Sequence, residues 1–564
     1  KVAAFVVGLA LVAAACGDDK DSTGDTTADT TADTTADTTG DTTPATDPPV
    51  EPAMRVTYSL SDVAVWDDGT PFSLADFQCT LDATMLTPGS LSTTGYDQIL
   101  SIANGASESE IVVEFSSLYA PWRLLFGGLL KAAETPDCTD VSAAFDGGIP
   151  YSGTEWQIDS WSAEQLVLVP NEGYNGARKQ TNGVSRVVFV PAEDGPTLLK
   201  SGAVDYIAPQ AYTGIDAELA DPNVDFVSGL GASFEGFYFQ SYDGPFANAD
   251  YRKAFVKSID RDAVYAQIYA PFAQGTPLLQ CGPIAPGPYC TDPYVNHYDP
   301  EGAAADLEAA GWTKDGEGFW VNPETGEVPE VRWMINTGNT RRESTQEFLI
   351  PLMAAAGFKV NADNCEALPC VFETRLPSLD YDMGMYINTV APDPAYLRTY
   401  GCDQIPTEEN QFQGQNSLGW CNEEATALLI AADAELDAAA RTEQVQQALQ
   451  LMADDYVMLP TLQFPNIGAR RTDRVDNAYA ELNNYRGIND WYRWTDVDGD
   501  GTIIVGAEQF PTVDCPNPIT ECANSTWFVW LVSFPVLPGM YDTTGGGEVL
   551  PSEYLTGEAV VEAL

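Results

Sequence analysis

The sequence contains little histidine and little positive charge. Its 564 residues include one histidine, His297, and 26 lysines and arginines against 83 aspartates and glutamates, so the formal net charge is -57. A chain with this charge is repelled by nucleic-acid phosphates, which excludes nucleic acid as a partner. We expect His297 to be a surface or packing residue, because a metal ligand or a catalytic base would need further partners that this chain does not offer in histidine.

Several catalytic motifs are also missing. The chain has no Gly-x-Ser-x-Gly elbow and no glycine-rich phosphate loop, and a single histidine leaves most hydrolytic triads without a base. These absences predict that the protein is not an enzyme. Composition leaves one enzymatic alternative open, a glycosidase that works with two carboxylates, because aspartate and glutamate are abundant.

The sequence lacks an apolar run of the roughly 20 residues that a membrane-spanning helix needs. The N-terminal apolar stretch, Val2 to Ala15, is shorter and ends at Ala13-Ala14-Ala15-Cys16. Small residues before a cysteine at the end of such a stretch are typical of a bacterial lipoprotein signal. We predict that residues 1–16 are a signal peptide and lipobox, and that lipid on Cys16 anchors the exported protein to the outer face of the cell membrane.

Residues 17–52 repeat Thr-Thr-Ala-Asp units. This segment has almost no apolar side chain larger than alanine and cannot bury a core, so we predict a disordered tether. The chain as a whole is 44% hydrophobic and 11% aromatic, which indicates that the rest is folded. About 500 residues are enough for two or three lobes.

Ten cysteines remain when Cys16 is set aside, and an even number in an exported chain favours disulfides. A metal site would need clustered cysteine and histidine ligands, which the single histidine does not favour. Sequence alone leaves the connectivity open. Proximity along the chain suggests four pairs, Cys281 with Cys290, Cys365 with Cys370, Cys402 with Cys421, and Cys515 with Cys522, which leaves Cys79 for Cys138.

Strand-like alternation and helical periodicity interleave through the body. Strands are predicted at 55–60, 110–115, 165–169 and 359–360. The predicted helices cover 249–265, 301–310, 342–356 and 423–455, the last of these divided near Asp437. This pattern predicts a layered α/β fold.

Five segments carry short motifs. In chain order they are Val65-Trp66-Asp67-Asp68-Gly69-Thr70-Pro71 with Ala75-Asp76-Phe77, Ser201-Gly202-Ala203-Val204-Asp205, Asp250-Tyr251-Arg252-Lys253-Ala254-Phe255 with Ser258-Ile259-Asp260-Arg261, Tyr298-Asp299-Pro300-Glu301 with Ala309-Ala310-Gly311-Trp312, and Tyr381-Asp382-Met383 with Pro392-Asp393-Pro394. Together and in this order they resemble the signature stretches of the family-5 extracellular solute-binding proteins, the capture subunits of peptide-type ABC importers.

The resemblance implies a two-lobed periplasmic-binding-protein type II (Venus flytrap) fold with an extra subdomain on the first lobe. It implies a monomer without cofactor that encloses a peptide or similar small solute between its lobes, closes by hinge motion and presents the solute to permease subunits. A lipoprotein with the same fold that senses or adheres, without transport, is the alternative. The residues that the resemblance places at the ligand are Glu508, Ser525, Thr526, Trp527, Tyr151, Ser152, Gly153, Thr154, Tyr386 and Asn388.

Peptide-binding relatives hold the ligand's amino terminus with an aspartate shortly before the Asp-Pro motif, and this chain departs from that pattern. It has Asn388-Thr389-Val390-Ala391 across the stretch, so no carboxylate stands there. Asp382 or Asp393 could substitute only if the loop is displaced. The resemblance therefore leaves a blocked peptide, a longer peptide or another solute open.

The order of one segment differs from that of the family, whose opening strand precedes the Asp-Gly-Thr-Pro motif. Here Met54 follows the tether almost directly, and Thr502 to Gln509, Asn517-Pro518-Ile519 and Ser525-Thr526-Trp527 resemble that opening strand and loop. We therefore predict a circular permutation, with Met54 and Leu564 side by side; a truncated body with an unrelated tail is the alternative.

The predicted segments are 1–16 signal peptide, 17–52 tether, 53–150 subdomain of lobe I, 151–243 lobe I, 244–466 lobe II, 467–495 return to lobe I, 496–501 acidic junction, 502–530 first strand and loop of lobe I, and 531–564 remainder of the subdomain.

The acidic junction imitates the start of a calcium-binding EF-hand loop. Asp496, Asp498 and Asp500 alternate before Gly501, but the position of the bidentate glutamate is occupied by Ala507. We interpret the segment as a solvated acidic linker, with calcium as the weaker alternative.

Overall fold

The computed structural model describes residues 50–564 except 91, 146, 274, 285, 296, 390–392, 408–409, 411–413, 479–490, 508–509, 511–516, 521–532, 534 and 544–547. The predicted signal peptide with Cys16 and nearly all of the predicted tether lie outside these residues. So do Glu508, Ser525, Thr526 and Trp527, and the predicted pair of Cys515 and Cys522. Among the described residues, the structure contains no helix with the length and apolar character needed to cross a membrane.

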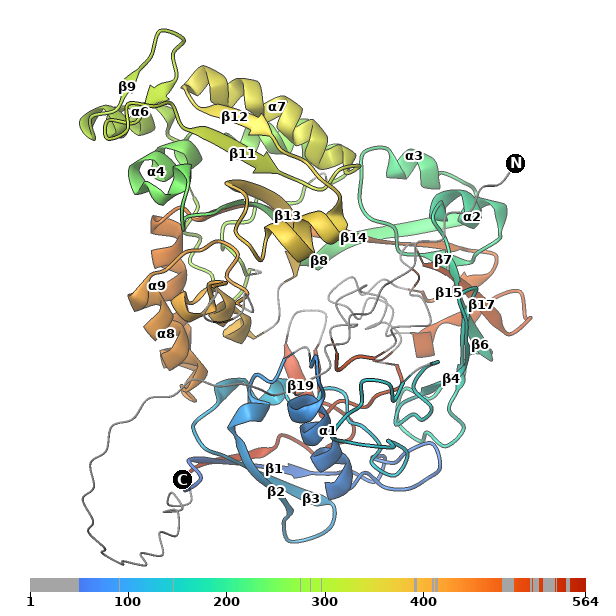
Figure 1. Cartoon of the computed structure of the whole chain (residues 1–564). Helices are drawn as coiled ribbons and strands as arrows, with labels where there is room; N and C mark the ends of the chain where they lie inside the picture. Colours follow the sequence, from blue (N-terminus) through green and yellow to red (C-terminus); the bar gives the residue numbers. More distant parts are fainter. Residues whose placement is uncertain are drawn as a thin grey trace, which may run out of the picture. The chain divides into compact units, whose positions relative to one another are not determined.

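Segments from both ends of the described chain share one antiparallel sheet. In the described residues its order is β2-β3-β1-β20, with β1 Met54–Ser59, β2 Ile99–Asn104, β3 Glu110–Phe115 and β20 Val560–Ala563. Met54 pairs with Ala563, and the Leu564 amide donates to the carbonyl of Ala53 at 2.9 Å. The C-terminus accordingly lies beside β1 (Figure 1). The predicted proximity of Met54 and Leu564 is therefore confirmed.

Helix α1, Leu74–Leu86, packs on this sheet and begins where its motif predicts. Gly69 turns the chain at φ +81°, in the left-handed region that favours glycine. The carboxylate of Asp76 accepts from the Ser73 amide at 2.8 Å, from the Trp66 indole at 3.3 Å and from the Ala132 amide at 2.8 Å. Asp76 thus joins the turn, the helix start and a distant loop, which explains its place in the motif.

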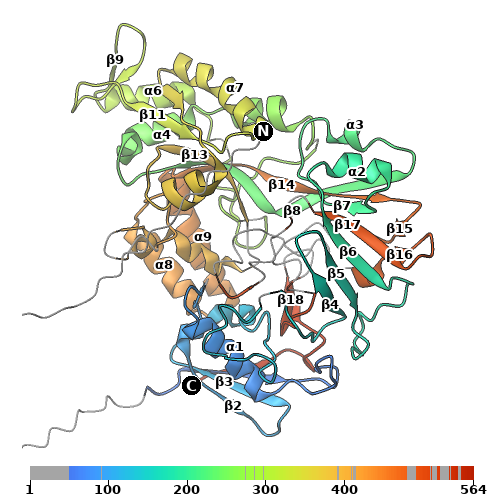
Figure 2. The ribbon, with the colours of Figure 1, turned by 45° about the vertical axis from the view of Figure 1, so that its right-hand side comes forward.

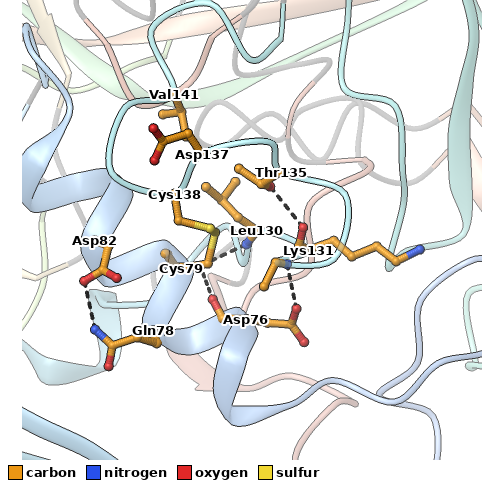
Figure 3. The surroundings of a disulfide bond; sticks show 12 residues. Asp76, Gln78, Cys79, Asp82, Leu130, Lys131, Thr135, Asp137, Cys138 and Val141 are labelled. Carbon is orange, nitrogen blue, oxygen red and sulfur yellow. Dashed lines mark hydrogen bonds between the residues drawn. A yellow bond between two sulfur atoms is a disulfide. The ribbon is translucent and has the colours of Figure 1, made fainter.

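Four of the five predicted disulfides lie in the described residues, and all four are present. They join Cys79 to Cys138, Cys281 to Cys290, Cys365 to Cys370, and Cys402 to Cys421. Figure 3 shows that Cys79 projects from α1 toward the loop that carries Cys138. That bond closes a sequence separation of 59 residues and fastens the loop to the buried face of the helix.

A second sheet runs through most of the molecule. Within the described residues it has ten strands in the order β12-β11-β13-β8-β14-β7-β17-β6-β5-β4 (Figure 2). The strands are β4 Trp156–Trp161, β5 Leu166–Pro170, β6 Arg186–Pro191, β7 Tyr206–Ile207, β8 Val224–Phe239, β11 Glu330–Met334, β12 Lys359–Ala362, β13 Met383–Thr389, β14 Met458–Arg471 and β17 Thr502–Ala507. We call the part built on β4 to β7 and β17 lobe I, and the part built on β11 to β13 lobe II. The strands β8 and β14 lie between them.

Lobe I receives one central strand from the last part of the chain. Strand β17 lies between β7 and β6 and runs parallel to both. Asp205, from the second motif, fixes it twice: its amide donates to the carbonyl of Ile504 at 2.7 Å, and its carboxylate accepts from the amide of Ile504 at 2.8 Å. Residues 502–507 are therefore integral to the lobe I sheet.

Lobe II buries its own core under helices that mostly match the prediction. The helices of the two lobes are α2 Gly195–Ser201, α3 Ile215–Leu219, α4 Ala249–Lys257, α5 Arg261–Val264, α6 Pro300–Ala309, α7 Thr340–Ala356, α8 Glu423–Asp433 and α9 Ala438–Asp454. The single helix predicted over 249–265 is wrong. It breaks after Lys257, because the side chain of Asp260 accepts from the Ala263 amide at 2.9 Å and starts a new helix.

The remaining elements are short. They are the strand pairs β9 Thr313–Lys314 with β10 Trp320–Val321, β15 Val475–Asp476 with β16 Thr495–Asp496, and β18 Tyr541–Thr543 with β19 Val549–Pro551, and the 3-10 or π turns Tyr96–Gln98, Ala120–Leu124, Pro245–Ala247, Tyr265–Tyr269, Ala367–Arg375, Pro394–Tyr400, Cys402–Gln404 and Trp491–Arg493.

Candidate functional site

Each lobe contributes three neighbouring parallel strands to the sheet. In lobe I these are β6, β17 and β7, and in lobe II they are β12, β11 and β13. Ligands of open α/β sheets bind outside the carboxyl ends of parallel strands. The edges formed by the carboxyl ends of these strands, one in each lobe, are therefore the candidate positions for a binding site.

The lobe I edge is hollowed. A pocket of about 150 Å³ lies beyond the ends of β6, β17 and β7, and its lining includes Ala192, Glu193, Asp194, Gln210, Tyr212 and Gly506. A Cβ atom at Gly506 would lie 2.8 Å from the Cβ of Ala192 and 3.0 Å from a methyl carbon of Ile207, so the close packing of this edge requires glycine. Glu508 follows β17 in sequence but lies outside the described residues, and its predicted contact with a ligand stays a prediction.

The two edges meet at a buried ion cluster. Glu235, on β8, has no exposed surface and faces two arginines from the start of α7. The guanidinium of Arg341 donates to both carboxylate oxygens at 3.0 Å, and Arg342 donates to Oε1 at 2.8 Å. Arg342 also donates to Asn336, just after β11, while Arg341 reaches the carbonyl of Ala211, beyond β7, at 3.4 Å.

This cluster keeps Glu235 ionised. Burial by itself raises the pKa of a carboxyl group, but the two arginines outweigh it and lower the pKa of Glu235 to about 2. Tyr269 donates its hydroxyl proton to Oε2 at 2.8 Å. Arg341 and Arg342 carry two positive charges and Glu235 carries one negative charge, so these three residues together have one surplus positive charge. The sequence signal for it was slight: two adjacent arginines, in a chain with few, near a predicted helix start.

Tyr386 lies in the middle of β13, and Asn388 lies on the same face near the carboxyl end of that strand. The Tyr386 ring stacks on that of Tyr238 with centroids 3.9 Å apart, and only 7% of Tyr386 is exposed. Asn388 lies beside the hydroxyl groups of Tyr238 and Tyr400. The structure therefore brings both residues to the lobe II edge, within an aromatic group, and their predicted contact with a ligand stays a prediction.

Residues 151–154 occupy a different setting from the two edges. The hydroxyl group of Tyr151 is hydrogen-bonded to that of Thr135 at 3.1 Å, and Ser152 and Thr154 are buried and bond to backbone carbonyls. Gly153 donates its amide to the carbonyl of Val536 at 3.0 Å, and a Cβ there would meet Pro538 and Phe72. The described contacts of this segment hold the subdomain together, and its predicted contact with a ligand stays a prediction.

The two aspartates considered for a ligand's amino group are both committed to arginines. Asp393 binds Arg441 through two hydrogen bonds of 2.6 and 2.7 Å, and it also accepts from the Ala395 amide. Asp382 accepts from the backbone amide and from the side chain of Arg332. These arginine contacts do not favour either carboxylate as the substitute for the aspartate that the family pattern places before the Asp-Pro motif.

The acidic junction is closed by its own contacts. Asp496, Asp498 and Asp500 bring carboxylate oxygens within 4.8 Å of one another. Asp496 accepts from the amides of Gly499 and Gly501, and Asp498 pairs with Arg474 at 2.6 Å. The flanking elements in the described residues are the strands β16 and β17, not helices. These contacts agree with a linker; calcium stays an untested alternative.

His297 packs inside lobe II. Its Nε2 lies 2.8 Å from the carbonyl of Ile259, and 9% of the residue is exposed. Burial, helped by the nearby charge of Arg261, lowers the pKa of His297 to about 4. It is a neutral packing residue at physiological pH, which confirms the second of the two expected roles.

Comparison with known proteins identifies the relatives of this fold. The sequence model of the bacterial extracellular solute-binding proteins, family 5 (middle region), matches residues 45–405. The oligopeptide-binding protein OppA of Mycobacterium tuberculosis is 28% identical over 277 residues, an alignment that covers 46% of this chain and 46% of OppA. The chain thus spans about half the length of this curated relative.

Solved structures extend the likeness over more of the chain. The periplasmic EDTA-binding protein EppA has a TM-score of 0.68 and 21% identity, with 79% of this chain and 85% of EppA covered. The oligopeptide-binding protein AppA of Bacillus subtilis, solved with a nonapeptide, has a TM-score of 0.60 and 16% identity, with 79% and 87% covered. The predicted fold class, a two-lobed type II binding protein of mixed α/β structure, is confirmed.

Proposed function

The chain belongs to the bacterial extracellular solute-binding proteins of family 5, and on that basis we propose that it captures a peptide or a similar small solute between its lobes for an ABC importer. The relatives differ in what their names say they bind, an oligopeptide in one case and EDTA in another. The solute that this protein prefers therefore depends on its own residues.

One observation carries the proposal. The carboxyl edges of the parallel strands of lobe I and of lobe II converge on the group formed by Glu235, Arg341 and Arg342, which joins the two edges through Ala211 and Asn336. A solute held there contacts both lobes at once. Binding that favours one arrangement of the lobes shifts their population, and a permease that distinguishes the arrangements then recognises the loaded protein.

The charges at this junction favour a solute with a carboxylate. The three-residue group has one surplus positive charge, whereas Asp393 is paired with Arg441 and Asp382 is paired with Arg332, which also binds Asp380. A carboxylate gains charge-assisted hydrogen bonds from arginine, while an ammonium group finds no unpaired partner in these two aspartates.

This preference gives a direct prediction for matched peptides. A short peptide should bind the full-length protein about tenfold or more tightly than its C-terminal amide, since a hydrogen bond to a charged group contributes roughly 1.5–3 kcal/mol. Its N-acetylated form should bind nearly as well as the free peptide. Isothermal titration calorimetry on the three forms measures the differences; a larger loss on acetylation than on amidation would contradict the assignment.

The decisive experiment for the function is native mass spectrometry of the protein purified from its own host. A co-purifying mass of peptide size, followed by a rise of the melting temperature with increasing concentration of the same peptide, supports capture. A co-purifying sugar, with no thermal shift in any peptide pool, would overturn the peptide assignment. Loss of peptide uptake by cells that lack the gene distinguishes transport from a sensing or adhesive role.

Export and anchoring complete the proposal. Residues 1–16 supply the signal and lipobox, lipid on Cys16 holds the monomeric protein at the outer face of the membrane, and residues 17–52 serve as the tether. Metabolic labelling with a fatty-acid analogue tests this, since the Cys16→Ser variant should lose the label while keeping its fold.

The chain order is part of the same proposal. Strand β17 occupies a central place in the lobe I sheet although it follows lobe II in sequence, and β20 pairs with β1. Both features support a circular permutation in which the family's opening strand has moved to the end of the chain.

A further inference from the structure

The strands between the lobes are irregular at one place. Strands β8 and β14 pair antiparallel along nearly their whole length, but the register shifts twice, between Pro460 and Leu462 and between Gln463 and Pro465. Extra residues of this kind bend a strand and increase its local twist. The first shift lies within the part of β8 that pairs with β13. The second lies at the end of that part, on the side toward the residues of β14 that pair with β7.

The buried ion cluster sits on this bend. Leu462 pairs with Glu235, and Thr461, the extra residue of the first shift, donates its hydroxyl proton to the carbonyl of Glu235 at 2.7 Å. The Glu235 side chain, fully buried, binds both arginines of α7. Helix α7 of lobe II is thus fixed to the bend itself.

The two arginines differ in what else they touch. Arg342 donates to Asn336, which belongs to lobe II. Arg341 crosses to lobe I: its Nη1 lies 3.4 Å from the carbonyl of Ala211, and its guanidinium lies 4.5 Å from the ring centre of Phe464. Ala211 and Phe464 both belong to the lobe I core formed with Leu199, Val204 and Ile215.

We infer that Arg341 is a latch between the lobes. It holds α7 of lobe II against the 211 segment and Phe464 in the lobe arrangement seen here, and it must let go when the lobes rotate about the bend in β8 and β14. Arg342 anchors Glu235 without crossing the hinge. This inference rests on the proposed function only in requiring that the lobes move.

The test compares Arg341→Gln with Arg342→Gln in the full-length protein without added ligand. Each variant leaves Glu235 one arginine, so both should keep the fold, as circular dichroism and melting temperature can verify. Hydrogen exchange of the amides at 211–219 and small-angle scattering report on the lobes. In the Arg341→Gln variant alone, we expect these amides to exchange about tenfold faster and the radius of gyration to increase. A tenfold change corresponds to about the loss of one charge-assisted hydrogen bond.

Equal changes in the two variants, or none in either, would overturn the latch. Arg341→Lys adds a second check if the glutamine variant does not fold: lysine keeps the charge but lacks the planar fork that reaches Glu235 and Ala211 together, so exchange should rise to an intermediate level. Failure of the proposed function would give a different scattering result. If wild-type scattering is unchanged by every peptide tried while Arg341→Gln still opens the protein, the latch stands and peptide capture does not.

Discussion

Glu235 is the central charge of the buried ion cluster. It is fully buried, and it is the negative charge that the structure places against Arg341 and Arg342. The Glu235→Gln variant would leave two buried arginines facing each other, and removal of one partner from a buried ion pair costs about 3–5 kcal/mol.

We therefore expect a drop of that size in the free energy of unfolding, measured by urea denaturation. Glu330→Gln is the matched control, because its ion pair with Lys359 is half exposed and exposed pairs contribute about 1 kcal/mol or less. Similar losses in both variants would show that the buried cluster contributes no more to the free energy of unfolding than an exposed ion pair.

Glu155 makes stability depend on pH in the opposite sense from an ordinary surface carboxylate. Burial raises the pKa of Glu155 to about 7, although Arg178 lies 3.3 Å away and opposes the shift. The ordinary pKa is about 4.3, so between these values the unfolded chain has lost a proton that the folded protein still holds, and stability falls as the pH rises.

The Glu155→Gln variant cannot ionise, and it should therefore lose less stability than the wild type between pH 5 and pH 8. The difference between the two proteins should change by an amount on the order of 2–3 kcal/mol over this range. Thermal or urea unfolding at a series of pH values measures it, with the exposed Glu164→Gln as control. Parallel curves for wild type and Glu155→Gln would contradict the argument.

At the residue scale, sequence reasoning found residues that stand in recognisable motifs and missed those that do not. Gly69, Asp76 and Asp205 belong to motifs, and the structure gives each a conformation or a contact that explains it, even where the partner is as distant in sequence as Ile504 is from Asp205. Glu235 and Arg341 are 106 residues apart, and their pairing follows from the sheet topology rather than from any local pattern. Tyr151 could be assigned to the subdomain core only once its neighbours in space were known.

At the scale of elements, disulfides should contribute in proportion to the loops they close. The pair Cys79–Cys138 spans 59 residues and Cys365–Cys370 spans 5. The chain-entropy relation gives about 4 kcal/mol for the first loop and about 2 kcal/mol for the second. Paired serine replacements, compared by denaturant unfolding under oxidising conditions, should follow that order; a reversed order would mean that packing around the shorter loop outweighs the entropy of the longer one.

Element boundaries were predictable where a cap or a turn marks them. The predicted division at Asp437 agrees with the start of α9, and the predicted end of the helix at residue 356 agrees with the end of α7, which Gly357 caps. The break at Ser258 was missed because the apolar spacing continues across it, and a single capping side chain, Asp260, decides the outcome. The position of β17 between β6 and β7 could not be read from periodicity, which does not say where in a sheet a strand inserts.

For the whole molecule, the pairing of β1 with β20 predicts that the chain can be rejoined. A variant that starts at residue 502, runs to Leu564, continues through a short glycine-serine linker into Ala53 and ends at Gly501 should fold to the same two sheets, because Ala53 and Leu564 are already hydrogen-bonded. We expect its melting temperature to lie within a few degrees of that of the starting protein, and peptide binding to be kept. An insoluble product would count against the permutation.

The late position of β17 also bears on biogenesis. Until the ribosome has synthesised residues 502–507, strands β6 and β7 have exposed edges where their partner will later lie, and β1 waits still longer for β20. Unpaired edges of this kind cannot close into a stable sheet and readily associate with other chains. A secretory channel translocates a polypeptide before it folds. For such export the delay would be favourable, because the lobe I sheet cannot be completed until residues 502–507 have been synthesised.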